Sequence, residues 1–131
     1  MLRAKAIMRT NPIAVKKETP IYEAIKTLVE NNVASLPVVN DDMTLVGIVS
    51  QKDLLEVMYN EEKPGKVEDF MTKNVFSFNQ ENSLVDIAEC FIKNHFRKVP
   101  IVSEGKLVGV VDKMDIIKYI LKLRCKDENA E

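Results

Sequence analysis

An internal repeat limits the folds that this chain of 131 residues can adopt. A shift of 63 residues places Met8 on Met71 and Pro37 on Pro100. After a short deletion opposite 41–43, a shift of 62 places Gly47 on Gly109 and Asp53 on Asp115. A half of roughly 60 residues buries too little apolar surface to be secure alone, so we expect the two halves to form one module.

The apolar residues have the same helical period in both halves. They recur at i, i+3, i+4 and i+7, a spacing that predicts an amphipathic helix in each half. The positions are Ile21, Ala24, Ile25 and Leu28 in the first half and Leu84, Ile87, Ala88 and Phe91 in the second. We expect Thr19 to cap the first helix, with Pro20 at its first helical position, and Ser83 with Asp86 to form a capping box on the second.

Short β-branched runs follow each predicted helix and indicate a β-hairpin in each half. The runs are 36–39 and 45–49 in the first half and 99–102 and 107–111 in the second. Short strands near 13–15 and 76–78 precede the helices, and a further helix follows each hairpin. The fold class is therefore α/β, with the order β-α-β-β-α twice. The predicted organisation is a first repeat over 1–62, a linker over 63–66, a second repeat over 67–122 and a polar tail over 123–131.

Composition excludes several classes of function. Nineteen basic and 20 acidic residues give a net charge of −1, which disfavours nucleic-acid and membrane-surface binding. The four glycines form neither of the common phosphate-binding loops. His95, Cys90 and Cys125 are too few for a clustered zinc site, and no nucleophile and base have credible spacing for catalysis. Two unpaired thiols and no long apolar run predict a soluble cytoplasmic protein. The lack of a catalytic arrangement predicts that it is not an enzyme.

The motifs of the repeat resemble a known family. The segments IMRTNP, ASLPVV and GIVSQKD in the first half, with FMTKNV, RKVPIV and GVVDKMD in the second, are similar to a tandem pair of cystathionine β-synthase (CBS) domains. This resemblance covers nearly the whole chain. It implies a pseudo-symmetric CBS-pair (Bateman) module, regulatory and usually dimeric, with up to two clefts for adenosine-containing ligands.

The resemblance also implies composite clefts. In the family, an Asp at the end of a Gly-h-h-[Ser/Thr]-x-x-Asp motif holds the ribose hydroxyls, where h is an apolar residue. The other repeat supplies an adenine wall from its first strand and phosphate contacts from the residues before its Pro-h-h strand. Carried over, the first cleft takes Ile48, Ser50 and Asp53 with Phe76, Phe96, Arg97 and Lys98.

The chemistry of these residues agrees with that assignment. A carboxylate can accept both hydrogen bonds of a cis-diol, and the planar guanidinium of Arg97 suits phosphate oxygens. A structural alternative is equally open, because Ser50 and Asp53 are also what a helix N-terminus requires for its own capping.

The second cleft departs from the family pattern. By resemblance it takes Val110, Asp112 and Asp115 with Ile13, Val33, Ala34 and Ser35. Asp112 replaces the hydroxyl residue, and Ala34 and Ser35 stand where the first cleft has Arg97 and Lys98. We do not expect this cleft to hold a nucleotide phosphate, and Asp112 is interpreted as a helix N-cap. A ligand without phosphate, such as adenosine or S-adenosylmethionine, fits it better.

The sequence thus favours a regulatory module that senses AMP, ADP or ATP and alters a client protein. The alternatives are a sensor of S-adenosylmethionine or NAD-type ligands and a scaffold with vestigial clefts. Neither a cofactor nor a metal is expected. A homodimer is expected because the helices that follow the hairpins carry more apolar residues than one buried stripe needs. These residues are Leu54, Leu55, Met58, Ile116, Ile117, Ile120 and Leu121.

Overall fold

The computed structural model describes residues 2–59 and 65–129, so Lys63 and Pro64 of the predicted linker and the last two residues of the predicted tail lie outside the described residues. The chain divides into two compact units. Unit 1 comprises Met1–Pro12, Ser77–Ser103 and Val108–Glu131, and unit 2 comprises Ile13–Phe76 and Glu104–Leu107.

Each unit contains a segment from the other sequence repeat. In unit 1, strand β1 (Arg9–Thr10) pairs antiparallel with strand β7 (Lys106–Asp112), with Arg9 opposite Val110. In unit 2, Thr72 bridges Ile48 through reciprocal backbone hydrogen bonds of 2.9 and 2.8 Å. Both connections sit at equivalent positions of the repeat. The segment that opens each repeat therefore completes the sheet edge formed mainly by the other repeat.

Two glycines make room for these exchanged segments. A Cβ atom on Gly47 would lie 2.7 Å from Sδ of Met71 and 2.9 Å from the carbonyl oxygen of Thr72. A Cβ on Gly109 would lie 2.8 Å from Sδ of Met8 and 2.9 Å from the carbonyl oxygen of Arg9. Glycine in the middle of a strand commonly marks such a close backbone approach. The repeated methionine and glycine are thus one packing device used in both units.

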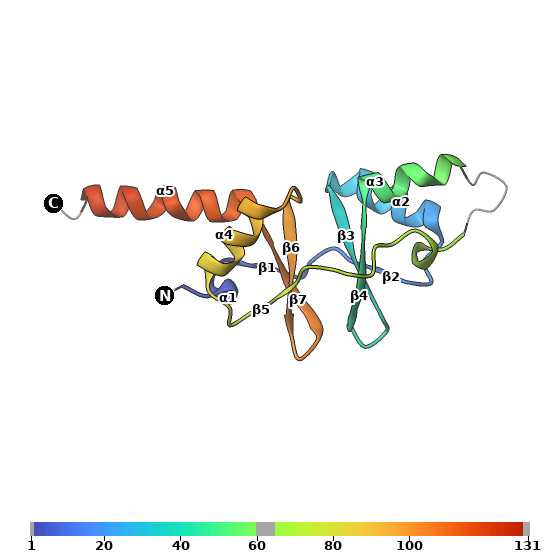
Figure 1. Ribbon diagram of the computed structural model, residues 1–131, viewed down its shortest axis with the longest axis horizontal. Helices are drawn as coiled ribbons and strands as arrows, with labels where there is room; N and C mark the ends of the chain where they lie inside the picture. Colours follow the sequence, from blue (N-terminus) through green and yellow to red (C-terminus); the bar gives the residue numbers. More distant parts are fainter. Residues whose placement is uncertain (1, 60–64, 130–131) are drawn as a thin grey trace. The chain divides into compact units, whose positions relative to one another are not determined.

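Unit 2 is built on a sheet in the order β2-β3-β4. Its strands are β2 (Val15–Lys16), β3 (Ser35–Val39) and β4 (Leu45–Ser50), and its helices are α2 (Ile21–Asn31), α3 (Gln51–Leu55) and the 3-10 turns Glu56–Tyr59 and Val67–Asp69. Strand β3 runs parallel to β2 and antiparallel to β4, which confirms the predicted hairpin. Helices α2 and α3 lie on the same side of this sheet (Figure 1).

Helix α2 buries the predicted apolar stripe, but its cap differs from the prediction. Ile21, Ala24 and Leu28 are buried. The predicted N-cap Thr19 is wrong, because Pro20 is the extended N-cap residue and the helix begins at Ile21. The Thr19 hydroxyl instead accepts a hydrogen bond of 3.1 Å from the Lys16 backbone N–H, so it stabilises the turn after β2.

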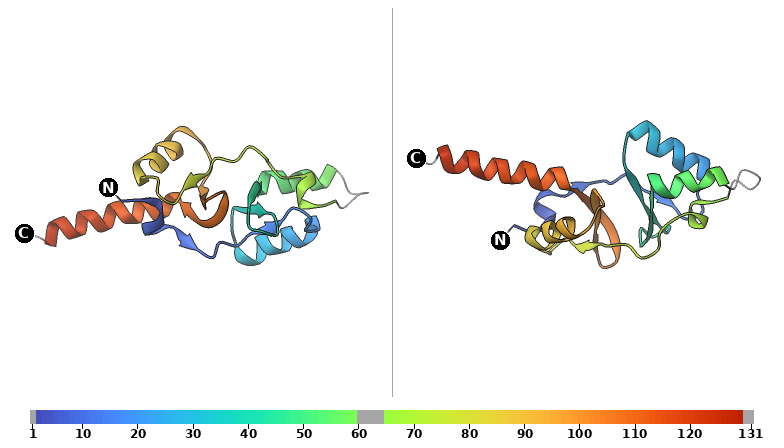
Figure 2. Two further views of the ribbon diagram at one scale, coloured as in Figure 1. Left: turned by 90° about the horizontal axis from the view of Figure 1, so that it is seen from below. Right: turned by 45° about the horizontal axis from the view of Figure 1, so that its top comes forward.

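Unit 1 repeats this plan with a sheet in the order β1-β7-β6-β5. Its further elements are α1 (Ala4–Ile7), β5 (Phe78–Asn79), α4 (Leu84–Lys93), β6 (Lys98–Ser103) and α5 (Lys113–Asn129). The Ser83 hydroxyl caps α4 by accepting from the Asp86 N–H at 3.3 Å. Elements α1 and β1 were not predicted. Residues 123–129, predicted as a polar tail, continue α5, which extends beyond its own sheet in both views of Figure 2.

Candidate functional site

The motif at the start of α3 forms a closed capping box. The backbone N–H of Ser50 donates to Asp53 Oδ2 at 2.9 Å, and the Ser50 hydroxyl donates to the same oxygen at 3.0 Å. In return, the Asp53 N–H donates to Ser50 Oγ at 3.3 Å. The structural alternative for Ser50 and Asp53 is therefore realised. Since the box uses Oδ2, the role of Asp53 toward a ligand depends on its other oxygen.

That other oxygen is lightly used. Thr72 Oγ1 donates to Oδ2 of Asp53 at 3.3 Å and lies 3.4 Å from Oδ1. Within the described residues, this long contact is the only hydrogen bond that Asp53 Oδ1 accepts. A carboxylate oxygen has two lone pairs, so Oδ1 retains acceptor capacity for an incoming hydroxyl group.

The start of α5 has a related arrangement in which Asp112 takes the place of Ser50. Asp112 Oδ1 accepts from the Met114 N–H at 2.8 Å, which confirms the prediction that Asp112 is an N-cap. The Asp112 N–H donates to Asp115 Oδ2 at 3.0 Å. As with Asp53 at α3, Oδ2 of Asp115 accepts the backbone N–H at the helix N-terminus, and Oδ1 is available to side chains.

Here the remaining oxygen is held by a cation. Arg9 donates to Asp115 Oδ1 from Nε at 3.2 Å and from Nη2 at 2.9 Å. The Asp115 side chain is 12% exposed and the Arg9 side chain 60% exposed. The hydrogen bond to Asp115, followed by its charge, raises the pKa of the Arg9 guanidinium. Asp115 is thus the acidic member of an ion pair, whereas Asp53 faces a neutral hydroxyl.

The predicted phosphate contacts lie beside α5. Arg97 Nε is 3.3 Å from Asp112 Oδ2, with the Arg97 side chain 70% exposed. The carbonyl oxygen of Arg97 also accepts from the Lys113 N–H at 2.9 Å. Lys98 is half-buried at the start of β6, and burial lowers the pKa of its ammonium group while the nearby Asp112 partly restores it. This cluster can neutralise an anion, with Asp112 as its internal competitor.

Each unit brings together residues assigned to different clefts. In unit 1, Arg97 and Lys98 of the first cleft lie beside Asp112 of the second. In unit 2, Gln51 at the start of α3 donates to the carbonyl oxygen of Ala34 at 3.2 Å, so the second-cleft segment 33–35 lies beside Ser50 of the first. The remaining assigned residues are Ile13 and Phe76, both exposed, Ile48, Val33 and Val110, half-buried, Ser35, buried, and Phe96, whose ring packs edge-on against Phe91.

Arg9 and Thr72 were not predicted as site residues. The signal that identifies them is the shift of 63 residues, which superimposes Arg9 on Thr72 at the strand contact of each unit. Because Arg9 is charged and Thr72 is neutral, the aligned repeat shows that the two halves differ in charge at this position.

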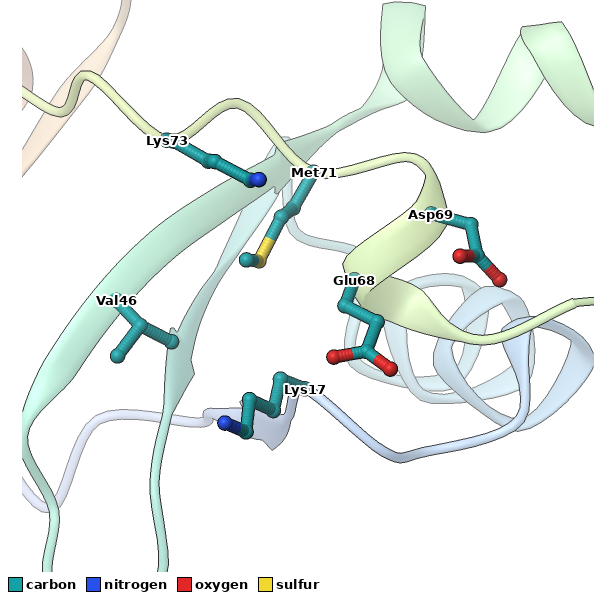
Figure 3. A pocket seen from close by; sticks show the side chains of 6 residues that line it. All are labelled: Lys17, Val46, Glu68, Asp69, Met71 and Lys73. Carbon is teal, nitrogen blue, oxygen red and sulfur yellow. The ribbon is translucent and has the colours of Figure 1, made fainter.

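A separate cavity of about 480 Å³ lies within unit 2. Its lining residues are Lys17, Val46, Glu68, Asp69, Met71 and Lys73 (Figure 3). It shares no residue with either predicted cleft. Two lysines and two acidic residues balance in charge, so the lining favours no ion of one sign. The described residues also contain no cluster of three or more His, Cys, Asp or Glu side chains that could hold a metal ion.

Comparison with known proteins identifies the family. The sequence profile of the CBS domain matches residues 4–60 and 67–122. The chain belongs to the CBS domain family. The two matches coincide with the two halves of the internal repeat, so this protein carries a pair of CBS domains. No helix among the described residues has both the length and the apolar character needed to span a membrane.

Several known proteins are similar over most of the chain. Protein MJ1225 of Methanocaldococcus jannaschii is 33% identical over 117 residues, which is 88% of this chain and 42% of that protein. The structure of CBSX2 in complex with AMP has a TM-score of 0.86 at 30% identity, covering 95% of this chain and 99% of the other. The CBS domain pair of protein MJ0100, in complex with 5′-methylthioadenosine and S-adenosyl-L-methionine, has a TM-score of 0.79 at 28% identity, covering 92% and 96%. The CBS-pair fold predicted from the sequence is thus confirmed.

Proposed function

We propose that this CBS pair is a regulatory module that binds an adenine nucleotide and does not catalyse a reaction. The observation that carries the proposal is the free acceptor capacity of Asp53 Oδ1 beside a neutral Thr72. A ribose cis-diol needs such an acceptor. The AMP bound to the similar CBSX2 and the adenosyl ligands bound to MJ0100 support the ligand class.

Arg97 and Lys98 are proposed as the phosphate contacts of the same ligand. Both are cationic, and Arg97 is exposed enough to reach a ligand. The partial burial of Lys98 lowers its pKa, so a phosphate that offsets its charge would gain more there than at a fully solvated lysine. The first cleft, with Ile48, Ser50, Asp53, Phe76, Phe96, Arg97 and Lys98, is therefore our proposed nucleotide site.

Calorimetric titration with AMP and adenosine tests this proposal. We expect Asp53→Ala to weaken both ligands by roughly 10- to 100-fold, because one charge-assisted hydrogen bond is lost. Arg97→Ala should weaken AMP and leave adenosine unchanged. Equal losses for both ligands in Arg97→Ala would make Arg97 a structural residue, and unchanged AMP affinity in Asp53→Ala would refute the proposed diol acceptor.

The same titrations with ADP, ATP, NAD and S-adenosylmethionine rank the alternative ligands. S-adenosylmethionine is included because the CBS domain pair of MJ0100 binds it. Its positive sulfonium suits a cleft with acidic rather than basic residues. The second cleft, with Ile13, Val33, Ala34, Ser35, Val110, Asp112 and Asp115, has two such carboxylates, but Arg9 pairs with Asp115 and Arg97 with Asp112, so a sulfonium must compete with both arginines. Absence of binding by every ligand would favour a scaffold with vestigial clefts.

We also propose that the protein acts as a homodimer. Ile116 is buried in the core of unit 1, but Ile117, Ile120 and Leu121 on α5 are exposed, as are Leu55 and Met58 after β4. Leu54 packs against the core of unit 2. Contiguous exposed apolar side chains on a helix that extends beyond its sheet are typical of a subunit interface. Sedimentation analysis should give a dimer mass, and Ile120→Lys should give a monomer.

Regulation in this proposal passes through the dimer to a client protein. Ligand binding shifts the packing of the exposed helices, and the client senses that shift. The free thiols Cys90 and Cys125 are consistent with a reducing compartment, and we infer the cytoplasm. A co-precipitation with and without AMP would identify a client whose retention depends on the nucleotide.

A further inference from the structure

We propose that Arg9 closes Asp115 to ligands and thereby restricts diol binding to Asp53. The inference rests on the proposed function, because it assigns a specificity-determining role to one residue of a module that binds adenosine-type ligands. Arg9 and Thr72, which the family resemblance did not assign to a site, make the contacts that distinguish Asp115 from Asp53, and each contact lies inside one unit.

Both oxygens of Asp115 are engaged. Oδ2 accepts from the Asp112 N–H at 3.0 Å, and Oδ1 accepts two hydrogen bonds from Arg9, at 2.9 and 3.2 Å. The two Arg9 donors occupy both lone pairs of that oxygen. A ribose hydroxyl that approached Oδ1 of Asp115 would have to displace a guanidinium N–H first, and the one lone pair left on Oδ2 can accept only one of the two hydrogen bonds of a cis-diol.

Asp53 is the matched comparison within the same chain. Thr72 occupies the position of Arg9, since each follows a methionine that packs on a strand glycine. Thr72 lies opposite Ile48 and Arg9 opposite Val110, at the same register of the two sheets. The Thr72 hydroxyl reaches Asp53 only at 3.3 and 3.4 Å. The two units thus present the same aspartate with two different partners.

Asp53 is paired with Thr72 and Asp115 with Arg9, and this difference decides which carboxylate can exchange its partner for a ribose diol. Both carboxylates accept charge-assisted hydrogen bonds, but Arg9 also supplies a second donor and a full opposite charge, which the Thr72 hydroxyl lacks. The Asp115 side chain is 12% exposed, so water compensates poorly for the loss of Arg9. A neutral diol can replace the Thr72 hydroxyl at Asp53 without leaving a charge unpaired, but it cannot replace the charge of Arg9 at Asp115. Asp112 lies near enough to favour the Arg9 charge as well, which strengthens the closed state.

Exchanging the two residues tests this role. The variants are Arg9→Thr, Thr72→Arg and the charge-retaining control Arg9→Lys, each titrated calorimetrically with adenosine, which needs no phosphate contact. We expect one adenosine site per chain in the wild type and in Arg9→Lys, and two in Arg9→Thr. Thr72→Arg should weaken the wild-type site by roughly 10- to 100-fold, because an arginine then competes for Asp53. Thermal melts show whether each variant is folded.

The outcomes separate this inference from the proposed function. Two sites in the wild type, or one site in Arg9→Thr, would overturn the role of Arg9 and leave adenosine binding established. Unchanged affinity in Thr72→Arg would overturn it independently, even where Arg9→Thr fails to fold. No binding by any folded variant, Thr72→Arg and the wild type included, would refute the proposed function and this inference together.

Discussion

The Nε atom of Arg97 lies 3.3 Å from the carboxylate of Asp112, although the family resemblance assigns these residues to different clefts. The acidic residue that replaces the motif serine at α5 therefore restrains a proposed phosphate contact. In the other unit the corresponding residue, Ser50, carries no charge. The unequal motifs thus influence both predicted clefts rather than the second alone.

Removing the charge of Asp112 should strengthen AMP binding. Asp112→Asn keeps the N-cap and frees Arg97 for phosphate. The Arg97 side chain is 70% exposed and contacts Asp112 only through Nε at 3.3 Å, so we expect this ion pair to contribute about 0.2–1 kcal/mol and AMP affinity to rise roughly 1.4- to 5-fold. Calorimetry with AMP measures the change and adenosine is the control. An equal gain for adenosine would show that Asp112 acts on something other than Arg97.

Filling the close approach at either strand glycine should destabilise the fold. Gly47→Ala places a Cβ against Met71 and the Thr72 backbone, and Gly109→Ala does the same against Met8 and Arg9. We expect each to cost about 1–3 kcal/mol of unfolding free energy, as overpacking does. Chemical denaturation measures it.

Gly105→Ala is the control for this prediction. Gly105 has a φ of +78° and nothing within 4 Å of its Cβ position, so alanine there suffers backbone strain without a clash. We expect a cost of about 1 kcal/mol. Adding Met71→Ala should relieve Gly47→Ala only in part, because the Thr72 carbonyl remains. Full relief would show that the backbone contact is unimportant.

Replacing Lys98 by methionine should stabilise the free protein while weakening AMP. Burial holds the pKa of Lys98 below that of a solvated lysine, so the folded chain disfavours its charged form. That cost is present below the folded pKa and disappears as the pH rises through the folded pKa toward the unfolded value of about 10.4. Lys98→Met should therefore be more stable than the wild type at pH 7, with the advantage diminishing at alkaline pH.

Denaturation at pH 7 and pH 10 checks this prediction, with Lys106→Met on the exposed part of β7 as the control. A Lys98→Met variant less stable than the wild type at pH 7 would contradict it. The result bears on function because a residue that costs stability in the free protein is typical of a binding site.

The two thiols should differ in reactivity. Cys125 is exposed, whereas Cys90 is half-buried on α4, where burial raises the pKa of its thiol despite a 3.7 Å contact from the Asn94 amide. Thiolate is the reactive form, so Ellman's reagent should label Cys125 quickly and Cys90 slowly. Cys125→Ser should remove the fast phase, and a fast phase that survives would contradict this assignment.

Sequence patterns predicted the elements that bury a stripe or a strand face. Helices α2 and α4 and the β3–β4 hairpin follow from apolar periodicity, because burial of those side chains determines the structure. Strand β1 and the Thr72 bridge did not follow, since they consist of backbone hydrogen bonds and a glycine contact that leave no periodic pattern. The continuation of α5 was missed because its polar residues are good helix formers without an apolar stripe.

For the candidate site, the motif residues could be predicted from the sequence, but their side-chain partners could not. The motif gave Asp53 and Asp115 as equivalents, and a helix-capping role for both motifs could be inferred from residue types alone. The partners of the two carboxylates could not be inferred, because Arg9 and Thr72 reach them through the exchanged segments. Equivalent side chains thus acquired different chemistry from residues distant in the chain.

The exchanged segments also set an order for assembly during synthesis. Unit 2 draws on nothing beyond Leu107, whereas unit 1 joins residues before Ile13 to residues after Leu107. The residues before Ile13 leave the ribosome early, yet the partners of β1 at Gly109 and Val110 are translated about a hundred residues later. Closing that span is entropically costlier than closing the contacts of unit 2. A nascent chain that has emerged from the ribosome only as far as Leu107 would therefore contain all of unit 2, while strand β1 of unit 1 would still lack its partner strand.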